Sequence, residues 1–155
     1  MNAEKTSRVI KYLAGYYGIL QTGHLILLIR AVLIVSRAGN MPFPALPPEG
    51  GWPLSSLPFL FGMGAADGIA ILSGLFFVYQ LLIKDQMKLL VGLFSLTIAL
   101  SSGLVYLVGT LPSGAWTEHL ASYLIVVFIF IPILPLAVNL FKTASFALNK
   151  NPDAS

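Results

Sequence analysis

The sequence contains no cysteine and little charge. The absence of cysteine in all 155 residues excludes disulfide bonds, thiolate metal sites, iron–sulfur clusters and cysteine nucleophiles. Only 10% of the residues are charged, whereas a soluble domain usually carries about a quarter. A chain with so little charge cannot cover a water-facing surface. The composition therefore excludes an ordinary soluble enzyme, as well as disordered and nucleic-acid-binding chains, which need abundant charge.

Hydrophobic residues make up 57% of the chain and concentrate in four long segments. These lie at about 12–35, 57–83, 89–111 and 117–141. About 20 helical residues cross a bilayer core of about 30 Å, so each segment is long enough to span once. Helices are required because lipid offers no partner to backbone N–H and C=O groups. The sequence therefore predicts an all-α, polytopic membrane protein, a four-transmembrane-helix bundle that forms one domain over residues 1–155.

The basic residues are distributed unevenly between the two ends of these segments. Only Arg37, with Arg30 near the end of its segment, belongs to one side. The positive-inside rule then predicts an N-in/C-in topology, with both termini cytoplasmic, in a bacterial inner or plasma membrane. The opposite side carries the other seven basic residues, Lys5, Arg8, Lys11, Lys84, Lys88, Lys142 and Lys150.

A proline-rich loop at 36–56 joins the first two segments on the non-cytoplasmic side. With the adjoining Pro58 it holds six of the ten prolines, and such a run favours extended geometry over helix. It also contains Trp52, while Trp116 lies in the other non-cytoplasmic loop, as expected for indoles at the headgroup layer. Three readings stay open for this loop: a rigid connector, a lid over a site, and a docking surface for a partner.

Polar residues inside the first two segments are the strongest functional signal. Tyr17, Gln21 and His24 recur at i, i+4 and i+7, so they share one helix face. Asp67 lies about 15 Å along the second segment, beside the close-packing motif of Gly64 and Gly68. His24 and Asp67 fall at similar depth on neighbouring helices, which makes them a candidate pair. The pair has two interpretations: polar glue between helices, or a site that binds a ligand or handles protons.

The third segment carries a stripe of small and polar residues at helical spacing. These are Ser95, Ala99, Ser102, Tyr106 and Gly109. Hydroxyl groups at such positions suit hydrogen bonds between helices. The stripe is expected to be either a packing seam or the wall of a narrow polar cavity shared with the His24/Asp67 pair.

A polar cluster is also expected on the outer side, from Arg30, Glu118 and His119. Arg30 either extends toward headgroups, pairs with Glu118 or Glu49, or holds an anionic ligand. Thr117 is expected to cap the fourth helix. Further along that helix, Pro132 and the nearby Pro135 predict a bend.

The sequence predicts no cofactor and no metal site. A haem would need His24 and His119 at the same depth, but the segment boundaries place His119 at the outer interface and His24 well below it. Haem therefore stays an unfavoured alternative. No short-spaced metal motif is present, and no phosphate-binding loop.

Three functions are compatible with the sequence. The first is a non-enzymatic accessory or assembly subunit of a membrane complex. The second is a lipid-, quinone- or cation-binding or transport protein with a polar midplane site. The third is a membrane-embedded enzyme acting on an apolar substrate, with Asp67/His24 or Glu118/His119 as acid–base groups.

The expected partners are the lipid bilayer and another membrane protein or a second copy, with no nucleic acid. The candidate ligand or proton-handling residues are His24, Asp67, Gln21, Tyr17, Ser102 and Tyr106.

Overall fold

The computed structural model describes residues 8–38, 48–49 and 51–150. Helices account for all the regular secondary structure in these ranges. Four stretches are long and apolar enough to cross a membrane, which confirms the all-helical class. The elements are α1 (Arg8–Ala38), η1 (Leu54–Ser56), α2 (Leu57–Leu82), α3 (Leu89–Thr110), η2 (Leu111–Ser113), α4 (Ala115–Glu118), α5 (Leu120–Phe130) and α6 (Ile133–Lys150).

The first helix is longer than its apolar core. α1 begins at Arg8 and ends at Ala38, whereas the apolar segment covers 12–35. The flanking residues contain no proline or glycine to stop the helix, so the backbone stays helical past the apolar core. The loop expected at 36–56 therefore begins later. Most of that loop, 39–47 and Gly50, lies outside the described residues.

The fourth apolar segment is divided into two helices. α5 ends at Phe130 and α6 begins at Ile133. Pro132 has no N–H to continue the helical pattern, and the Ile131 N–H instead donates to the Phe128 carbonyl over 3.3 Å. The proline thus interrupts the helix at the place where the sequence predicted a bend.

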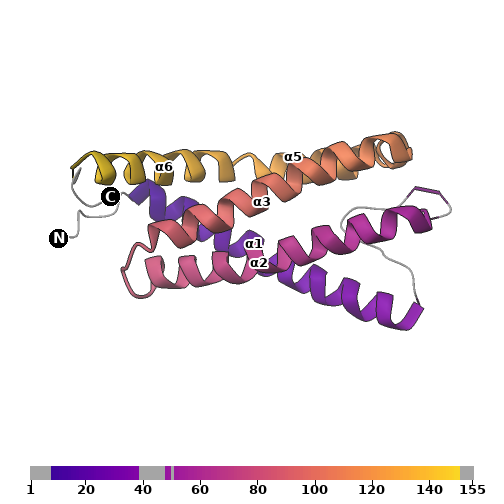
Figure 1. Cartoon of the computed structure of the whole chain (residues 1–155), viewed down its shortest axis with the longest axis horizontal. Helices are drawn as coiled ribbons and strands as arrows, with labels where there is room; N and C mark the ends of the chain where they lie inside the picture. Colours follow the sequence, from indigo (N-terminus) through magenta and orange to yellow (C-terminus); the bar gives the residue numbers. More distant parts are fainter. Residues whose placement is uncertain (1–7, 39–47, 50, 151–155) are drawn as a thin grey trace.

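The helices pack as neighbours of alternating direction (Figure 1). α1 packs against α2 and α6, and α3 packs against α2 and α6. One end of the bundle holds the start of α1, the end of α6 and the 84–88 turn. We call it the basic end. The opposite end, which carries Trp52 and Trp116, is the tryptophan end.

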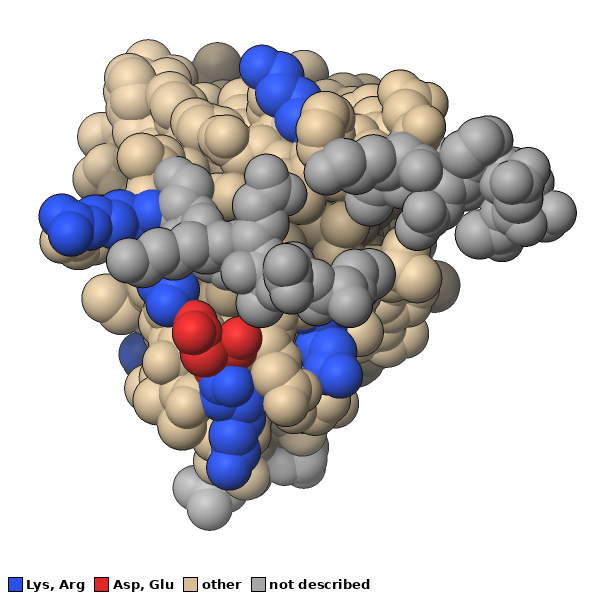
Figure 2. Space-filling view, turned by 90° about the vertical axis from the view of Figure 1, so that its left-hand side faces the viewer, with Lys and Arg blue, Asp and Glu red and all other residues tan. Residues whose placement is uncertain are grey.

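Charge gathers at the basic end. Figure 2 shows Lys and Arg side chains spread over this face, with a small acidic area beside one of them. The Lys11 Nζ lies 2.6 Å from Asp85 Oδ1 and so joins the start of α1 to the 84–88 turn. The two side chains are 40% and 76% exposed, so this ion pair adds little to stability.

Most of the lateral surface is apolar. Large hydrophobic side chains on every long helix are exposed, including Val32, Leu72, Leu104 and Phe128. A water-soluble monomer rarely exposes so much contiguous apolar surface. The surface therefore suits a hydrocarbon environment.

Two buried clusters hold the bundle together. One lies toward the basic end and joins α1, α2, α3 and α6, with Tyr17, Phe77 and Leu140 among its fully buried members. The other lies toward the tryptophan end, where Tyr106 and Tyr123 pack with Leu60 and Ala31. The helices are thus anchored at both ends.

Glycines on α2 let neighbouring helices approach. A Cβ added at Gly64 or Gly68 would lie 3.7 or 3.8 Å from Leu28 of α1, so the expected close-packing motif faces that side chain. A Cβ at Gly74 would lie 2.7 Å from Ser95 Oγ and 3.0 Å from Tyr17 Cε1. The absence of a side chain at Gly74 therefore leaves room for this buried pair beside α2.

Gly74→Ala should destabilise the bundle by about 1–2 kcal/mol. Overpacking a fitted core usually costs about 1–3 kcal/mol, and the better helix propensity of alanine offsets part of that. Gly62→Ala is the matched control, because a Cβ there meets nothing within 4 Å. Unfolding by SDS in mixed micelles measures both variants. Equal stabilities for the two variants would contradict this packing.

Candidate functional site

A large groove lies beside the middle of the bundle. Its volume is about 990 Å³, and it is partly open to the surroundings. It forms because α1 and α5 separate toward the tryptophan end (Figure 1). We call it the central groove. Its walls come from α1, α2, α3, α5 and α6, and its polar side chains are Tyr16, His24, Asp67, Ser102 and Tyr106.

The remaining wall of the central groove is apolar. Leucine, isoleucine, valine, phenylalanine and glycine residues line it, and no lysine or arginine is among the described residues that do so. Small-molecule sites in proteins usually occupy about 300–1,000 Å³ and combine apolar walls with a few polar groups. The central groove has this character at the upper end of that size range.

His24, Asp67 and Ser102 form a polar cluster in the wall. The Ser102 hydroxyl donates to Asp67 Oδ1 over 2.6 Å. His24 Nε2 lies 3.7 Å from the other carboxylate oxygen, Oδ2, which is longer than a direct hydrogen bond. The side chains of His24 and Asp67 are 19% and 12% exposed. The cluster thus joins α1, α2 and α3 while two of its groups keep access to the groove.

Tyr106 extends the polar wall toward the tryptophan end. Its hydroxyl lies 3.2 Å from the Tyr123 hydroxyl, and the two rings stack with centroids 6.2 Å apart. Tyr106 follows Ser102 by one helical turn on α3, as the stripe predicted. The stripe then continues through the buried Thr110, while Gly109 is exposed and faces Phe59.

Tyr17 and Gln21 lie outside the central groove. The Tyr17 hydroxyl is 2.7 Å from Ser95 Oγ, and the Ser95 hydroxyl donates to the Ala70 carbonyl over 2.7 Å. Serine has one hydroxyl proton, so Tyr17 is the donor to Ser95. Gln21 is buried beside Tyr17, and its Oε1 has no hydrogen-bond partner among the described residues. Of the residues that share this helix face, Tyr17 and Gln21 therefore pack between helices, while His24 lines the groove.

The residues expected on the outer side, Arg30, Glu118 and His119, belong to α1, to α4 and to the junction before α5. Glu118 Oε2 accepts a hydrogen bond from the Glu49 N–H over 2.6 Å, and this contact ties the proline-rich loop to α4. Arg30 is exposed, and within the described part of the chain no ion pair joins it to Glu118. His119 occupies the position before α5.

The expected capping role of Thr117 is wrong. Thr117 lies inside α4 rather than before it, and its hydroxyl donates to the Gly114 carbonyl over 2.7 Å. Gly114 begins this short helix with a φ of 81°, a conformation that favours glycine. The fourth apolar segment therefore starts with a tight glycine turn and not with a side-chain cap.

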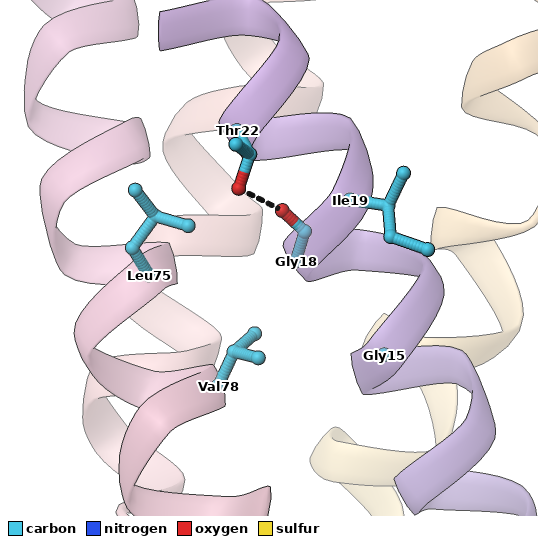
Figure 3. Close-up of a pocket in the computed structure, with 6 residues that line it drawn as sticks. All are labelled: Gly15, Gly18, Ile19, Thr22, Leu75 and Val78. Carbon is cyan, nitrogen blue, oxygen red and sulfur yellow. Dashed lines mark hydrogen bonds between the residues drawn. The ribbon is translucent and has the colours of Figure 1, made fainter.

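A second, shallower recess lies between α1 and α2. Its volume is about 380 Å³, and Figure 3 shows its six lining residues, with the Thr22 hydroxyl bonded to the Gly18 carbonyl. Among the described residues, those that line it are all uncharged. A Cβ at Gly18 would lie 2.9 Å from Val78 Cγ1, so the helices already touch there. The recess is a packing gap without chemistry.

No metal-binding group is found in the ranges that the structure describes. Three or more His, Asp or Glu side chains do not converge anywhere in them. His24 lies in the wall of the central groove and His119 at the junction of α4 and α5. The expectation of no cofactor stays a prediction.

The sequence indicates the polar cluster but not the apolar walls around it. Leu100, Gly103 and Leu107 of α3 line the groove together with Val127 and Phe130. Their i, i+3, i+7 spacing on α3 places them on one face, but such a face is equally typical of lipid contact. Only the divergence of α1 from α5 distinguishes a groove wall from an ordinary membrane-facing surface.

Comparisons with protein-family models, with curated proteins and with solved structures find no match to this chain. A helical bundle is an architecture that many unrelated functions share. The central groove and its polar cluster are therefore the features that bear on function.

Proposed function

We propose that this protein is a membrane protein that binds a lipid-like molecule in the central groove. The observation that carries the proposal is a buried polar cluster in the wall of an otherwise apolar groove of about 990 Å³. The apolar walls would hold a hydrocarbon chain. His24 and Asp67 would hold the polar end of the same molecule.

The depth of the cluster supports a specific role over accidental placement. Asp67 is the eleventh residue of the 26-residue α2, about 15 Å from the start of the helix. Ionisable groups at the middle of a spanning helix are costly unless they are paired or hydrated. Ser102 satisfies one carboxylate oxygen, while the groove brings a ligand within reach of the other. A ligand with a polar end would add a hydrogen bond to that second oxygen.

The proposed orientation places the basic end in the cytoplasm. Arg8 and Lys11 at the start of α1 and Lys84 and Lys88 in the 84–88 turn belong to that end, and the positive-inside rule favours it on the cytoplasmic side. The central groove then opens sideways into the bilayer. A lipid-like ligand would enter from the membrane without crossing water, so its chain would never leave an apolar environment.

The other expected functions stay predictions. An accessory subunit would use a partner helix to fill the central groove. A membrane-embedded enzyme would use His24 and Asp67 as acid–base groups on a substrate in the same groove. We favour binding because it requires only the groove and the polar cluster.

Filling the groove should prevent binding. Gly23 lines the central groove, and a Cβ there meets nothing within 4 Å, so Gly23→Trp projects a large side chain into open space. Gly62→Trp is the control, since Gly62 has the same freedom but does not line the groove. The assay is photolabelling in phosphatidylcholine nanodiscs with a hexadecanol that carries a diazirine in its chain. Gly23→Trp should reduce labelling about tenfold, because the tryptophan side chain occupies space that the ligand chain would fill.

The control variant determines how this experiment is interpreted. Gly62→Trp should label within about twofold of the unmodified protein, because its groove is intact. Peptide mapping should place the label on α1, α3 or α5. Equal labelling of both variants, or a label spread over all lipid-facing helices, would overturn the proposed function.

A further inference from the structure

We infer that the ligand of the central groove has an uncharged hydroxyl as its polar end. The inference rests on the proposed function and concerns the class of molecule that the groove takes. His24 Nε2 and Asp67 Oδ2 stand 3.7 Å apart in the groove wall. This separation is too long for a direct hydrogen bond and suits a bridging oxygen.

A hydroxyl matches both members of this pair at once. Asp67 already accepts the Ser102 proton at Oδ1, so Oδ2 presents an acceptor to the groove. The carboxylate favours the His24 tautomer that carries its proton on Nε2, which presents a donor. A hydroxyl donates one hydrogen bond and accepts others. It can therefore donate to Asp67 while it accepts from His24.

Anionic lipids match the groove poorly. The described residues that line it include no lysine or arginine, so none of them offers the permanent positive charge that a phosphate or a fatty-acid carboxylate favours. Asp67 would also repel a second negative charge. Bringing that charge to the middle of a spanning helix adds the cost of leaving water. Phospholipids and free fatty acids are therefore disfavoured.

Molecules whose polar group only accepts hydrogen bonds can bond to His24 but not to Asp67. A quinone, ester or ether oxygen accepts from His24, but its lone pairs would face the carboxylate oxygen of Asp67. The loss of a hydrogen bond to a charged group corresponds to about tenfold or more in affinity. The preferred class is thus a long-chain, isoprenoid or sterol-like alcohol.

A series of probes with one chain and different ends tests this inference. The photoreactive hexadecanol labels the full-length protein in phosphatidylcholine nanodiscs, and four unlabelled competitors are titrated against it. These are hexadecanol, hexadecyl methyl ether, palmitic acid and hexadecyl phosphate. Hexadecanol should compete at least about tenfold better than the methyl ether, which keeps the acceptor oxygen but has a methyl group in place of the donor hydrogen. Both anions should compete more weakly than hexadecanol.

Asp67→Asn adds a control within the site. The amide keeps a neutral acceptor, so the preference for hexadecanol over its methyl ether should fall several-fold while the protein still folds. Equal competition by alcohol and ether, or stronger competition by either anion, would overturn the inference and leave the proposed function standing. Failure of every competitor to reduce labelling of the groove would overturn both.

Discussion

Asp67→Leu should reduce binding of the photoreactive hexadecanol about tenfold to a hundredfold. Leucine removes the acceptor that faces the groove, and hydrogen bonds to charged groups are each worth about 1.5–3 kcal/mol. It also leaves the Ser102 hydroxyl without its 2.6 Å partner. Equilibrium photolabelling in nanodiscs measures the loss. Helix content by circular dichroism shows whether the bundle still forms.

Asp85, in the turn between α2 and α3, provides the control for Asp67. Asp85 lies in the 84–88 turn with a φ of 52°, is not among the residues that line the central groove, and asparagine tolerates that conformation. Asp85→Asn should leave labelling unchanged, although it removes the ion pair with Lys11. If Asp67→Leu binds the probe as well as Asp85→Asn does, the polar cluster does not hold the ligand.

Tyr17→Ala should destabilise the bundle by about 2–4 kcal/mol. Tyr17 is fully buried and its hydroxyl contacts Ser95 over 2.7 Å, so alanine leaves a cavity among three helices. Replacing a buried aromatic residue by alanine in a water-soluble protein costs about 3–5 kcal/mol. The value is smaller here because lipid removes much of the transfer contribution, while lost packing remains.

Two further tyrosine variants separate packing from hydrogen bonding. Tyr17→Phe keeps the ring and should cost about 0.6 kcal/mol, a typical value for one hydrogen bond between membrane helices. Tyr12→Ala should be near neutral, because Tyr12 is 78% exposed. SDS unfolding in mixed micelles ranks the three variants. A phenylalanine variant as unstable as the alanine variant would show that the hydroxyl, and not the ring, carries the stability.

The main features of the fold could be predicted because membrane constraints are strong. Length and hydropathy alone indicate four helices that are long and apolar enough to span a membrane, and Pro132 marks the interruption between α5 and α6. The ends of the helices were less predictable. Thr117 resembled a cap, but the chain starts this region with Gly114 in a left-handed conformation, and no hydropathy pattern specifies such a turn.

The candidate site was predictable in its polar part only. His24 and Asp67 stand out as polar residues at similar depth, and helical spacing adds Ser102 and Tyr106. Gln21 and Tyr17 share the His24 face by spacing, yet Tyr17 bonds to Ser95 and neither residue lines the groove. The way in which the helices cross determines which residues of this face line the groove. Crossing depends on many small contacts, such as Leu28 against Gly64 and Gly68, which spacing does not reveal.

Native mass spectrometry of the protein released from its own membrane tests the central claim most directly. The central groove predicts one additional uncharged, lipid-like mass for each chain of the unmodified protein. The same mass should remain on Gly62→Trp and be absent from Gly23→Trp, because only the latter fills the groove. A bare chain, or a chain that carries only a protein partner and no small molecule, would contradict the account.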